Sequence, residues 1–254
     1  MTRTLWKVLA AVVAVPVLVM GSYQVATALA HDTRTVDEEV PAEGASVLDV
    51  DNEAGDVRIV GVEAATSVRV HARISDGWRA TAHDLRVEGD RLVLRASCPN
   101  FGSDYCEVDY TIEVPADLRV EARGEQRISV TDLAGDVYVE SDASRIEVAR
   151  VTGDVTVRSD QGRIEATELT SDHVDAGADQ GSVLLSFEAP PRSIVAEADQ
   201  GSIEIVLPKV PVVAYASDAR ADQGSVTELI DEDPDGDRTI SAHADQGDVT
   251  VRYR

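Results

Sequence analysis

The sequence predicts an all-β protein: a β-solenoid of about 18-residue, two-strand coils, preceded by an N-terminal β region with a disulfide hairpin and by one N-terminal transmembrane helix. Three observations support this prediction. Apolar and polar residues alternate with period two after residue 45, strand openings recur about every nine residues from Ile128, and residues 8–20 are almost wholly apolar. The expected division is residues 1–30 as a transmembrane anchor or signal segment, 31–45 as a polar stalk, 46–115 as the N-terminal β region and 116–254 as β-solenoid repeats.

The first thirty residues have the pattern of a targeting segment. Arg3 and Lys7 precede the apolar run, and no acidic residue occurs before Asp32. About 20 apolar residues suffice to cross a bilayer as a helix, and the basic end stays inside. We therefore expect a single-pass protein of the cell membrane, with the membrane as one partner and most of the chain extracytoplasmic. The alternative is cleavage after Ala30, which would give a secreted protein.

Composition restricts the partners. The net charge is −24, and loss of residues 1–30 with their two basic residues would take it to −26. Such a surface repels phosphate backbones, so no nucleic-acid partner is expected. An envelope polymer or protein of unknown identity is the expected partner. Only 4% of residues are aromatic, which predicts an aliphatic core.

Cys98 and Cys106 are the only cysteines. In an exported chain, such a pair is typical of a structural disulfide. Residues 92–98 and 106–114 alternate so that both sulfur atoms lie on the buried face. This pattern predicts a hairpin whose loop, residues 99–105, is closed by the bridge.

From about residue 116 the strands repeat with a short period. Their aliphatic openings lie nine residues apart, with one step of ten and one of eleven, at Ile128, Val137, Ile146, Val155, Ile164, Val174, Val183, Ile194 and Ile203. Turn signals alternate, so the repeating unit is two strands and two turns. A fixed period of this kind indicates coils that each bury an inner face against their neighbours.

The layout resembles a large bacterial family of adhesin-like β-strand-repeat domains whose function is unassigned. The resemblance lies in LDVDNEAGDVRIVG (Leu48–Gly61), CEVDYTIEVPADLRVEARG (Cys106–Gly124) and the later turns SDQGRIE, ADQGSV and ADQGSI. It covers nearly all of residues 46–254 and implies a membrane-anchored, extracytoplasmic, right-handed β-solenoid. The corner is more often Asn-Gly in that family, where this chain has Gln-Gly. The resemblance implies no substrate.

An Asp-Gln-Gly triplet recurs five times and is expected to form one corner of the stack. Equivalent corners would lie about 4.8 Å apart. Gly supplies a positive φ, and Asp accepts a backbone N–H, which contributes about 1.5–3 kcal/mol against a carboxylate repulsion of about 1 kcal/mol in water. We therefore expect a structural ladder that requires no cofactor, with weak calcium binding as the alternative. Its members are Asp160, Gln161, Gly162, Asp179, Gln180, Gly181, Asp199, Gln200, Gly201, Asp222, Gln223, Gly224, Asp245, Gln246 and Gly247.

A second calcium hypothesis concerns residues 230–239. Asp231, Asp233 and Asp235 with the glycine that follows match the opening of an EF-hand loop. The twelfth position is Ala242, where that loop needs Glu, so any calcium would bind weakly, with a dissociation constant of about 0.1–1 mM. The alternative is a solvated acidic loop.

Three loop aromatics, Trp78, Phe101 and Tyr105, are candidates for contact with a glycan or protein partner. The alternative is that they cover an open end of the repeats.

The sequence shows no catalytic motif of the Gly-x-Ser-x-Gly, P-loop or His-x-x-x-His kind. We expect a non-enzymatic, adhesin-like module that serves envelope interaction, adhesion or stress sensing. The alternatives are a calcium-dependent binding module and a β-helical polysaccharide-processing enzyme, which would need one distinctive carboxylate cluster.

Overall fold

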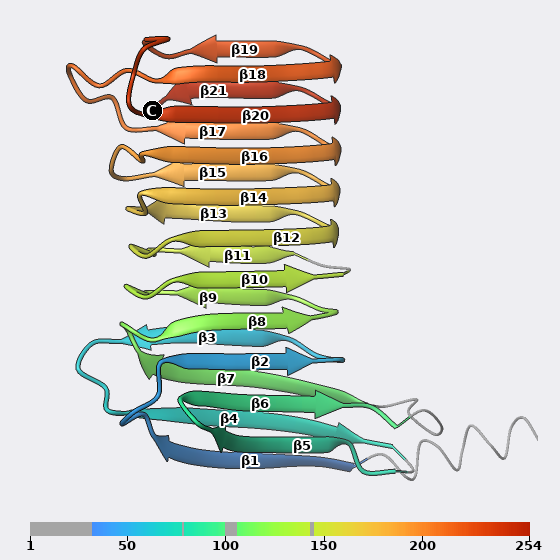
Figure 1. Ribbon diagram of the computed structural model, residues 1–254. Coiled ribbons are helices and arrows are strands. Elements are labelled where there is room, and N and C mark those ends of the chain that lie inside the picture. The colour runs from blue at the N-terminus through green and yellow to red at the C-terminus, as the bar shows by residue number, and fades with distance from the viewer. Residues whose placement is uncertain (1–31, 78, 100–105, 143–144) are drawn as a thin grey trace, which may run out of the picture.

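The computed structural model describes residues 32–77, 79–99, 106–142 and 145–254. These residues form strands and turns with no helix among them, and the strands make two large sheets that lie face to face (Figure 1). The core between the sheets is aliphatic, as the low aromatic content predicts, with Tyr110, Phe187 and Tyr215 as its largest buried side chains.

We refer to the two sheets as sheet A and sheet B. Sheet A has the order β1 (Asp32–Pro41), β4 (Ser67–Asp76), β7 (Glu107–Pro115), β3 (Val57–Val62), β9 (Ile128–Thr131), β11 (Ile146–Ala149), β13 (Ile164–Leu169), β15 (Val183–Phe187), β17 (Ile203–Leu207), β21 (Val249–Tyr253) and β19 (Val226–Leu229). Sheet B has the order β18 (Ala216–Gln223), β20 (Thr239–Gln246), β16 (Ser193–Gln200), β14 (His173–Gln180), β12 (Val155–Gln161), β10 (Val137–Ser141), β8 (Arg119–Gly124), β2 (Val47–Asn52), β6 (Arg91–Ser97) and β5 (Ala82–Glu88).

In the middle of the molecule, successive strands alternate between the two sheets. Within each sheet, neighbouring strands are parallel. Sheet A places in one column the residues Ile128, Ile146, Ile164, Val183 and Ile203. All five side chains are at most 1% exposed. The spacing of the sequence thus stacks branched aliphatic side chains between the sheets, where each contributes about 1.5–3 kcal/mol through burial.

The expected solenoid is wrong: the fold is a pair of mixed sheets, and the N-terminal strands belong to the same two sheets. Consecutive coils would keep the strands of each sheet in sequence order. Instead, β1, β4 and β7 pair antiparallel, as do β5 and β6, and β3 lies between β7 and β9. At the other end, β20 and β21 lie inside β18 and β19, which precede them in the chain. The period reports which residues face inward, and it carries no information about the order of the strands.

The disulfide between Cys98 and Cys106 is confirmed, with Cα atoms 5.8 Å apart. The expected hairpin is wrong, because Cys98 follows β6 in sheet B whereas Cys106 precedes β7 in sheet A. Cys98 continues the alternation of buried residues in β6, and Cys106 continues that of β7, so the alternation fits two facing strands as well as two paired ones. The bridge therefore ties one sheet to the other.

The expected transmembrane helix and signal anchor are also corrected. The described residues contain no helix, and none of their segments is a helix long and apolar enough to cross a membrane. Residues 1–30, on which that expectation rested, lie outside the described residues.

The strands at the C-terminal end carry polar residues where the interior strands carry aliphatic ones. Ser217 on β18 aligns with Ile240, and Glu228 on β19 aligns with Val251. The Ser217 hydroxyl donates a hydrogen bond to Glu228 from one sheet to the other. Because β18 and β19 are edge strands of the described sheets, this pair places two polar groups on their open side, beside Val226, which aligns with Val249 and is 40% exposed.

The opposite end is closed by Glu38 on β1, His83 on β5 and Tyr110 on β7. The side chain of His83 is 7% exposed, and its Nε2 lies 3.4 Å from the Glu38 carboxylate. Its Nδ1 lies 2.7 Å from the Tyr110 hydroxyl. Burial raises the pKa of Tyr110, and the Glu38 carboxylate raises it further, so this hydroxyl stays protonated. The three side chains join the edge strands of both sheets.

Candidate functional site

The Asp-Gln-Gly corners lie at one long edge of the molecule, where the strands of sheet B end (Figure 1). The corner glycines donate backbone hydrogen bonds of 2.7–3.0 Å to glutamine carbonyls of the next corner. Four of these glycines have φ between 142° and 150°. The corners stack in the register Gln161, Gln180, Gln200, Gln246 and Gln223.

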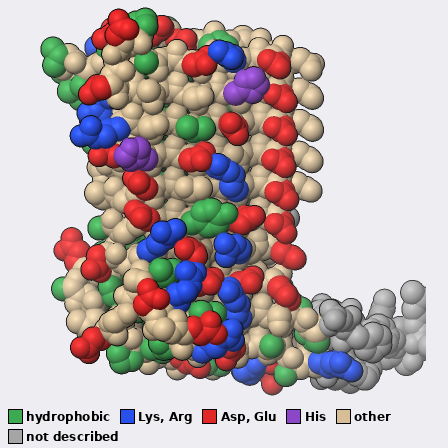
Figure 2. All heavy atoms as spheres, viewed as in Figure 1, with side chains coloured by type: hydrophobic (Ala, Val, Ile, Leu, Met, Phe, Trp, Pro, Cys, Tyr) green, Lys and Arg blue, Asp and Glu red, His purple; other side chains and the backbone are tan. Residues whose placement is uncertain are grey.

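The aspartates of these corners belong to a longer row of exposed carboxylates. Asn52 aligns with Gly124, Gly124 with Ser141, and Ser141 with Ser159, and an acidic residue follows each of these four. Figure 2 shows acidic side chains in a column along the right-hand edge. We refer to this set as the acidic row, which in spatial order is Glu53, Glu125, Asp142, Asp160, Asp179, Asp199, Asp245 and Asp222.

Few basic side chains pair with the acidic row, because the arginines pair elsewhere. On the outer face of sheet B, Arg95 binds Asp49 through two contacts of 3.0 and 3.1 Å, and Arg91 contacts Glu121 at 2.5 Å. Among the described residues, the one ion pair to a member of the row comes from His243. Carboxylates on neighbouring strands repel by about 1 kcal/mol per pair in water. The edge is therefore a strong attractor of cations.

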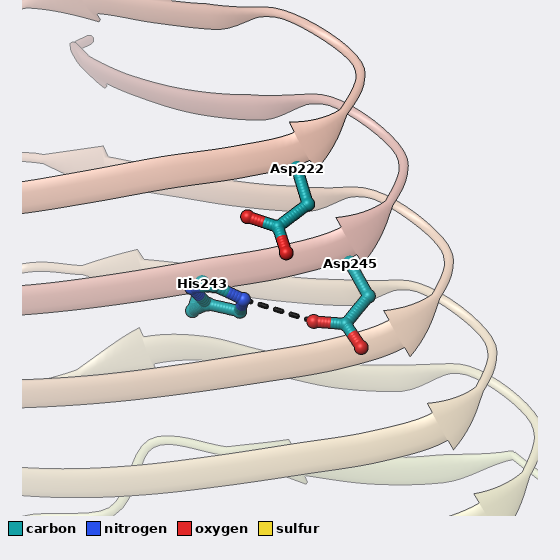
Figure 3. A group of neighbouring side chains, drawn as sticks. All are labelled: Asp222, His243 and Asp245. Carbon is teal, nitrogen blue, oxygen red and sulfur yellow. Dashed lines mark hydrogen bonds and ion pairs between the residues drawn. The ribbon is translucent and has the colours of Figure 1, made fainter.

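One part of the row includes an imidazole. His243 and Asp245 lie on β20, with Nε2 2.9 Å from a carboxylate oxygen, and Asp222 lies beside them on β18 (Figure 3). One potential ligand atom from each residue lies within 4.8 Å of the other two. The side chains of His243 and Asp245 are 42% and 55% exposed, so the group is open to solvent. An imidazole nitrogen with two carboxylates is a donor set that divalent metal ions bind.

Asp248 lies just past the last corner and has a structural contact. Its carboxylate accepts hydrogen bonds from the Ser225 hydroxyl at 2.7 Å and from the Ser225 N–H at 2.8 Å. The hydroxyl contact, followed by the N–H contact, holds the pKa of Asp248 below its usual range. An ionised Asp248 thus fixes the start of β19 against β21.

The loop of the second calcium hypothesis is held by contacts of its own. Asp231 accepts from the Tyr253 hydroxyl at 3.4 Å, and Asp233 accepts from the N–H of Asp235 at 3.1 Å. Among the residues that the structure describes, these three aspartates do not form a group whose ligand atoms all lie within reach of one ion. Calcium binding by this loop stays a prediction.

The aromatic contact residues fall on parts of the chain that are not described. Trp78, Phe101 and Tyr105 lie outside the described residues. Their predicted contact with a glycan or protein partner remains a prediction.

Four members of the site are not predicted by the sequence pattern. The acidic row extends through Asp142, Glu125 and Glu53, which lack the Asp-Gln-Gly triplet and align only through strand register. His243 was missed because it has no second histidine at a ligand spacing. A signal was present: the residue two positions before the aspartate of each corner is Arg158, Gly177, Glu197, Arg220 or His243, and only one of these is an imidazole.

The fold and this edge define an all-β protein of two mixed sheets with an exposed row of carboxylates. No family model matches the sequence, and no curated protein matches it. A "putative cell adhesion protein" from Clostridium sporogenes shares 14% identity with a TM-score of 0.38, over 88% of this chain and 100% of that one. A "putative adhesin" from Bacteroides fragilis shares 13% identity with a TM-score of 0.48, over 87% and 97%. A "putative lipid binding protein" from Parabacteroides distasonis shares 8% identity with a TM-score of 0.26, over 88% and 97%.

Proposed function

We propose that this protein is a non-enzymatic, adhesin-like binding module that presents the acidic row to a partner in the cell envelope. The observation that carries the proposal is the row itself, in which strand pairing fixes carboxylates at regular intervals along one edge. A repeating charge at about 4.8 Å suits a partner that is itself repetitive. A cationic polymer would bind directly, and an anionic envelope polymer would bind through divalent cations.

The disulfide supports a location outside the cytoplasm. Cys98 and Cys106 are paired, and structural disulfides persist in oxidising compartments. A rigid body suits display of the row, because hydrogen-bonded strands hold in place the backbone that carries the carboxylates, so that only side chains need to be ordered on binding. Two of the distant structural likenesses are described as adhesion proteins, and the proposal does not rest on them.

The test is co-sedimentation of the purified full-length protein with isolated cell envelopes, with calcium in one series and a chelator in the other. The test variant carries Asp160→Asn, Asp179→Asn and Asp199→Asn, which removes three charges from the centre of the row. Each exposed contact is worth about 0.2–1 kcal/mol, so loss of three should weaken retention by about threefold to a hundredfold. Retention that requires calcium indicates a cation-bridged partner, and retention in both series indicates a cationic one.

A matched variant separates the row from net charge. Glu147→Gln, Glu165→Gln and Glu204→Gln remove the same charge from the outer face of sheet A, at strands β11, β13 and β17. This variant should sediment as the wild type does. Equal losses in the two variants, or no retention of the wild type in either series, would refute the proposal.

A further inference from the structure

We propose that Asp222, His243 and Asp245 form a binding site for one divalent transition-metal ion of the zinc class. The three side chains come from two neighbouring strands of sheet B, and Figure 3 shows them turned toward one another. The site lies on the acidic row, but it does not depend on the function proposed for that row.

The geometry is close to what such an ion requires. Zinc lies about 2.0–2.2 Å from nitrogen and oxygen ligands, so two tetrahedral ligands lie about 3.3–3.6 Å apart. The Nε2 of His243 is 2.9 Å from Asp245, and all three ligand atoms lie within 4.8 Å of one another. Rotation of the exposed carboxylates would close the difference, while parallel pairing holds the backbone of both strands. Water would complete the coordination on the solvent side.

The donor set selects the class of metal. Calcium and magnesium prefer oxygen ligands only, and the rest of the acidic row offers carboxylates. An imidazole nitrogen shifts the preference toward zinc, nickel and copper. His243 is the imidazole among the residues that precede a corner aspartate by two positions, so this one part of the row differs in chemistry from the others.

The surroundings favour a cation at this point. Glu197 on β16 aligns with His243 on one side and adds negative charge. Arg220 on β18 aligns with it on the other side, but its guanidinium is held by Asp218 at 2.8 Å. The metal would also join the edge strand β18 to β20. Metal binding should therefore slow hydrogen exchange in β18 as well as occupy the site.

The test is isothermal titration of zinc chloride into the untagged, chelator-treated, full-length protein at neutral pH. We expect one equivalent to bind, with affinity lowered at least about tenfold in His243→Gln and in Asp222→Asn. His173→Gln is the control, because His173 is similarly exposed and lies 3.1 Å from the single carboxylate of Asp154. Its affinity should equal that of the wild type. Millimolar calcium should not displace the zinc.

The variants lie on the surface, and thermal melts without metal verify that each is folded. Hydrogen exchange of β18 should slow with zinc in the wild type and in His173→Gln, and should not change in His243→Gln. The proposal is overturned if the wild type binds no zinc, if His243→Gln binds it as the wild type does, or if calcium displaces it. The centre-of-row variant used to test the proposed function leaves all three ligands in place. It should therefore still bind zinc even where it no longer binds envelopes.

Discussion

Substitution of Gly181 by alanine tests how closely successive corners of the sheet B edge are packed. Gly181 has a φ of +150°, and a Cβ atom placed on it would lie 1.6 Å from the carbonyl oxygen of Gly162 in the neighbouring corner. That oxygen belongs to the backbone, so no side-chain rotation can relieve the overlap. The N–H of Gly162 also donates to Gln180 at 2.7 Å, which fixes the spacing between these two corners. Alanine must therefore both strain its own backbone and push two strands apart.

The expected cost follows from these contacts. A non-glycine residue in a sparsely populated backbone region costs about 1–3 kcal/mol. Overpacking costs a further 1–3 kcal/mol, and loss of the hydrogen bond costs about 1 kcal/mol. We expect Gly181→Ala to lower the free energy of unfolding by about 4 kcal/mol. For a domain of about 200 residues this corresponds to a fall in Tm of about 10 °C.

Gly89→Ala is the control. Gly89 also has a positive φ, +66°, but a Cβ atom there would meet nothing within 4 Å. Alanine in that conformation costs about 1–2 kcal/mol, so the Tm should fall by only a few degrees. The assay is urea denaturation with parallel thermal melts of both variants. We infer that contact with the neighbouring corner, and not only the positive φ, requires glycine at residue 181. A difference of less than about 1 kcal/mol between the free energies of unfolding of the two variants would refute this inference.

Three further predictions concern the rest of the fold. Reduction of Cys98–Cys106, whose sequence separation is 8, should lower the free energy of unfolding by roughly 2.5 kcal/mol because the bridge closes a short loop; an unchanged urea midpoint would contradict this. The Arg150 guanidinium holds the pKa of Asp132 below its usual range, so the stability that this pair adds is present above the unfolded pKa of about 4 and is lost as the pH falls through the lower folded pKa. Below about pH 4 the wild type should therefore lose stability more steeply than Asp132→Asn, as measured by urea midpoints from pH 6 to 3, and parallel curves would exclude the effect. Glu228→Val should expose an aliphatic inner face at the C-terminal end and cause concentration-dependent association in sedimentation velocity, and sedimentation identical to the wild type would show that a polar group is not needed there.

The sequence predicted the interior of the fold better than its ends. The spacing from Ile128 to Ile146 and Ile164 depends on which residues face inward, and hydrophobic burial imposes that pattern directly. The order of strands within a sheet imposes no comparable pattern on the sequence. β20 has the same alternation whether it lies inside or outside β18, so the topology at the C-terminal end could not be read from the pattern.

Alternation shows which face is buried but not which strands are neighbours, and this also explains why the expected disulfide hairpin is wrong. Alternation identified the buried face for Cys98 and Cys106, and the pairing is correct. A buried face, however, is shared by every strand that borders the core. The pattern therefore does not distinguish two neighbours within a sheet from two strands that face each other across the core.

The candidate site was predictable in part for a related reason. The repeated triplet revealed the corner aspartates, because repetition is visible in the sequence. The extension of the row through Asp142 and Glu125 depends on strand register, which the triplet does not encode. His243 carries a chemical signal that becomes visible only when the corners are aligned and compared position by position.

The polar ends of the stack also bear on which surface is available for binding. The unpaired backbone groups of an edge strand can pair with a further strand. An edge strand with the apolar inner face of the interior strands here would also offer that strand an apolar surface. The terminal strands place Glu38 and His83 at one end, and Ser217 and Glu228 at the other, at positions that face inward. Adding a strand at either end would cover the partly exposed Glu38, Ser217 and Glu228 and remove water from them, which costs free energy unless each finds a new partner. The ends are thus poor sites for strand addition, whereas the acidic row runs along the side of the sheets and stays exposed in each described strand that contributes to it.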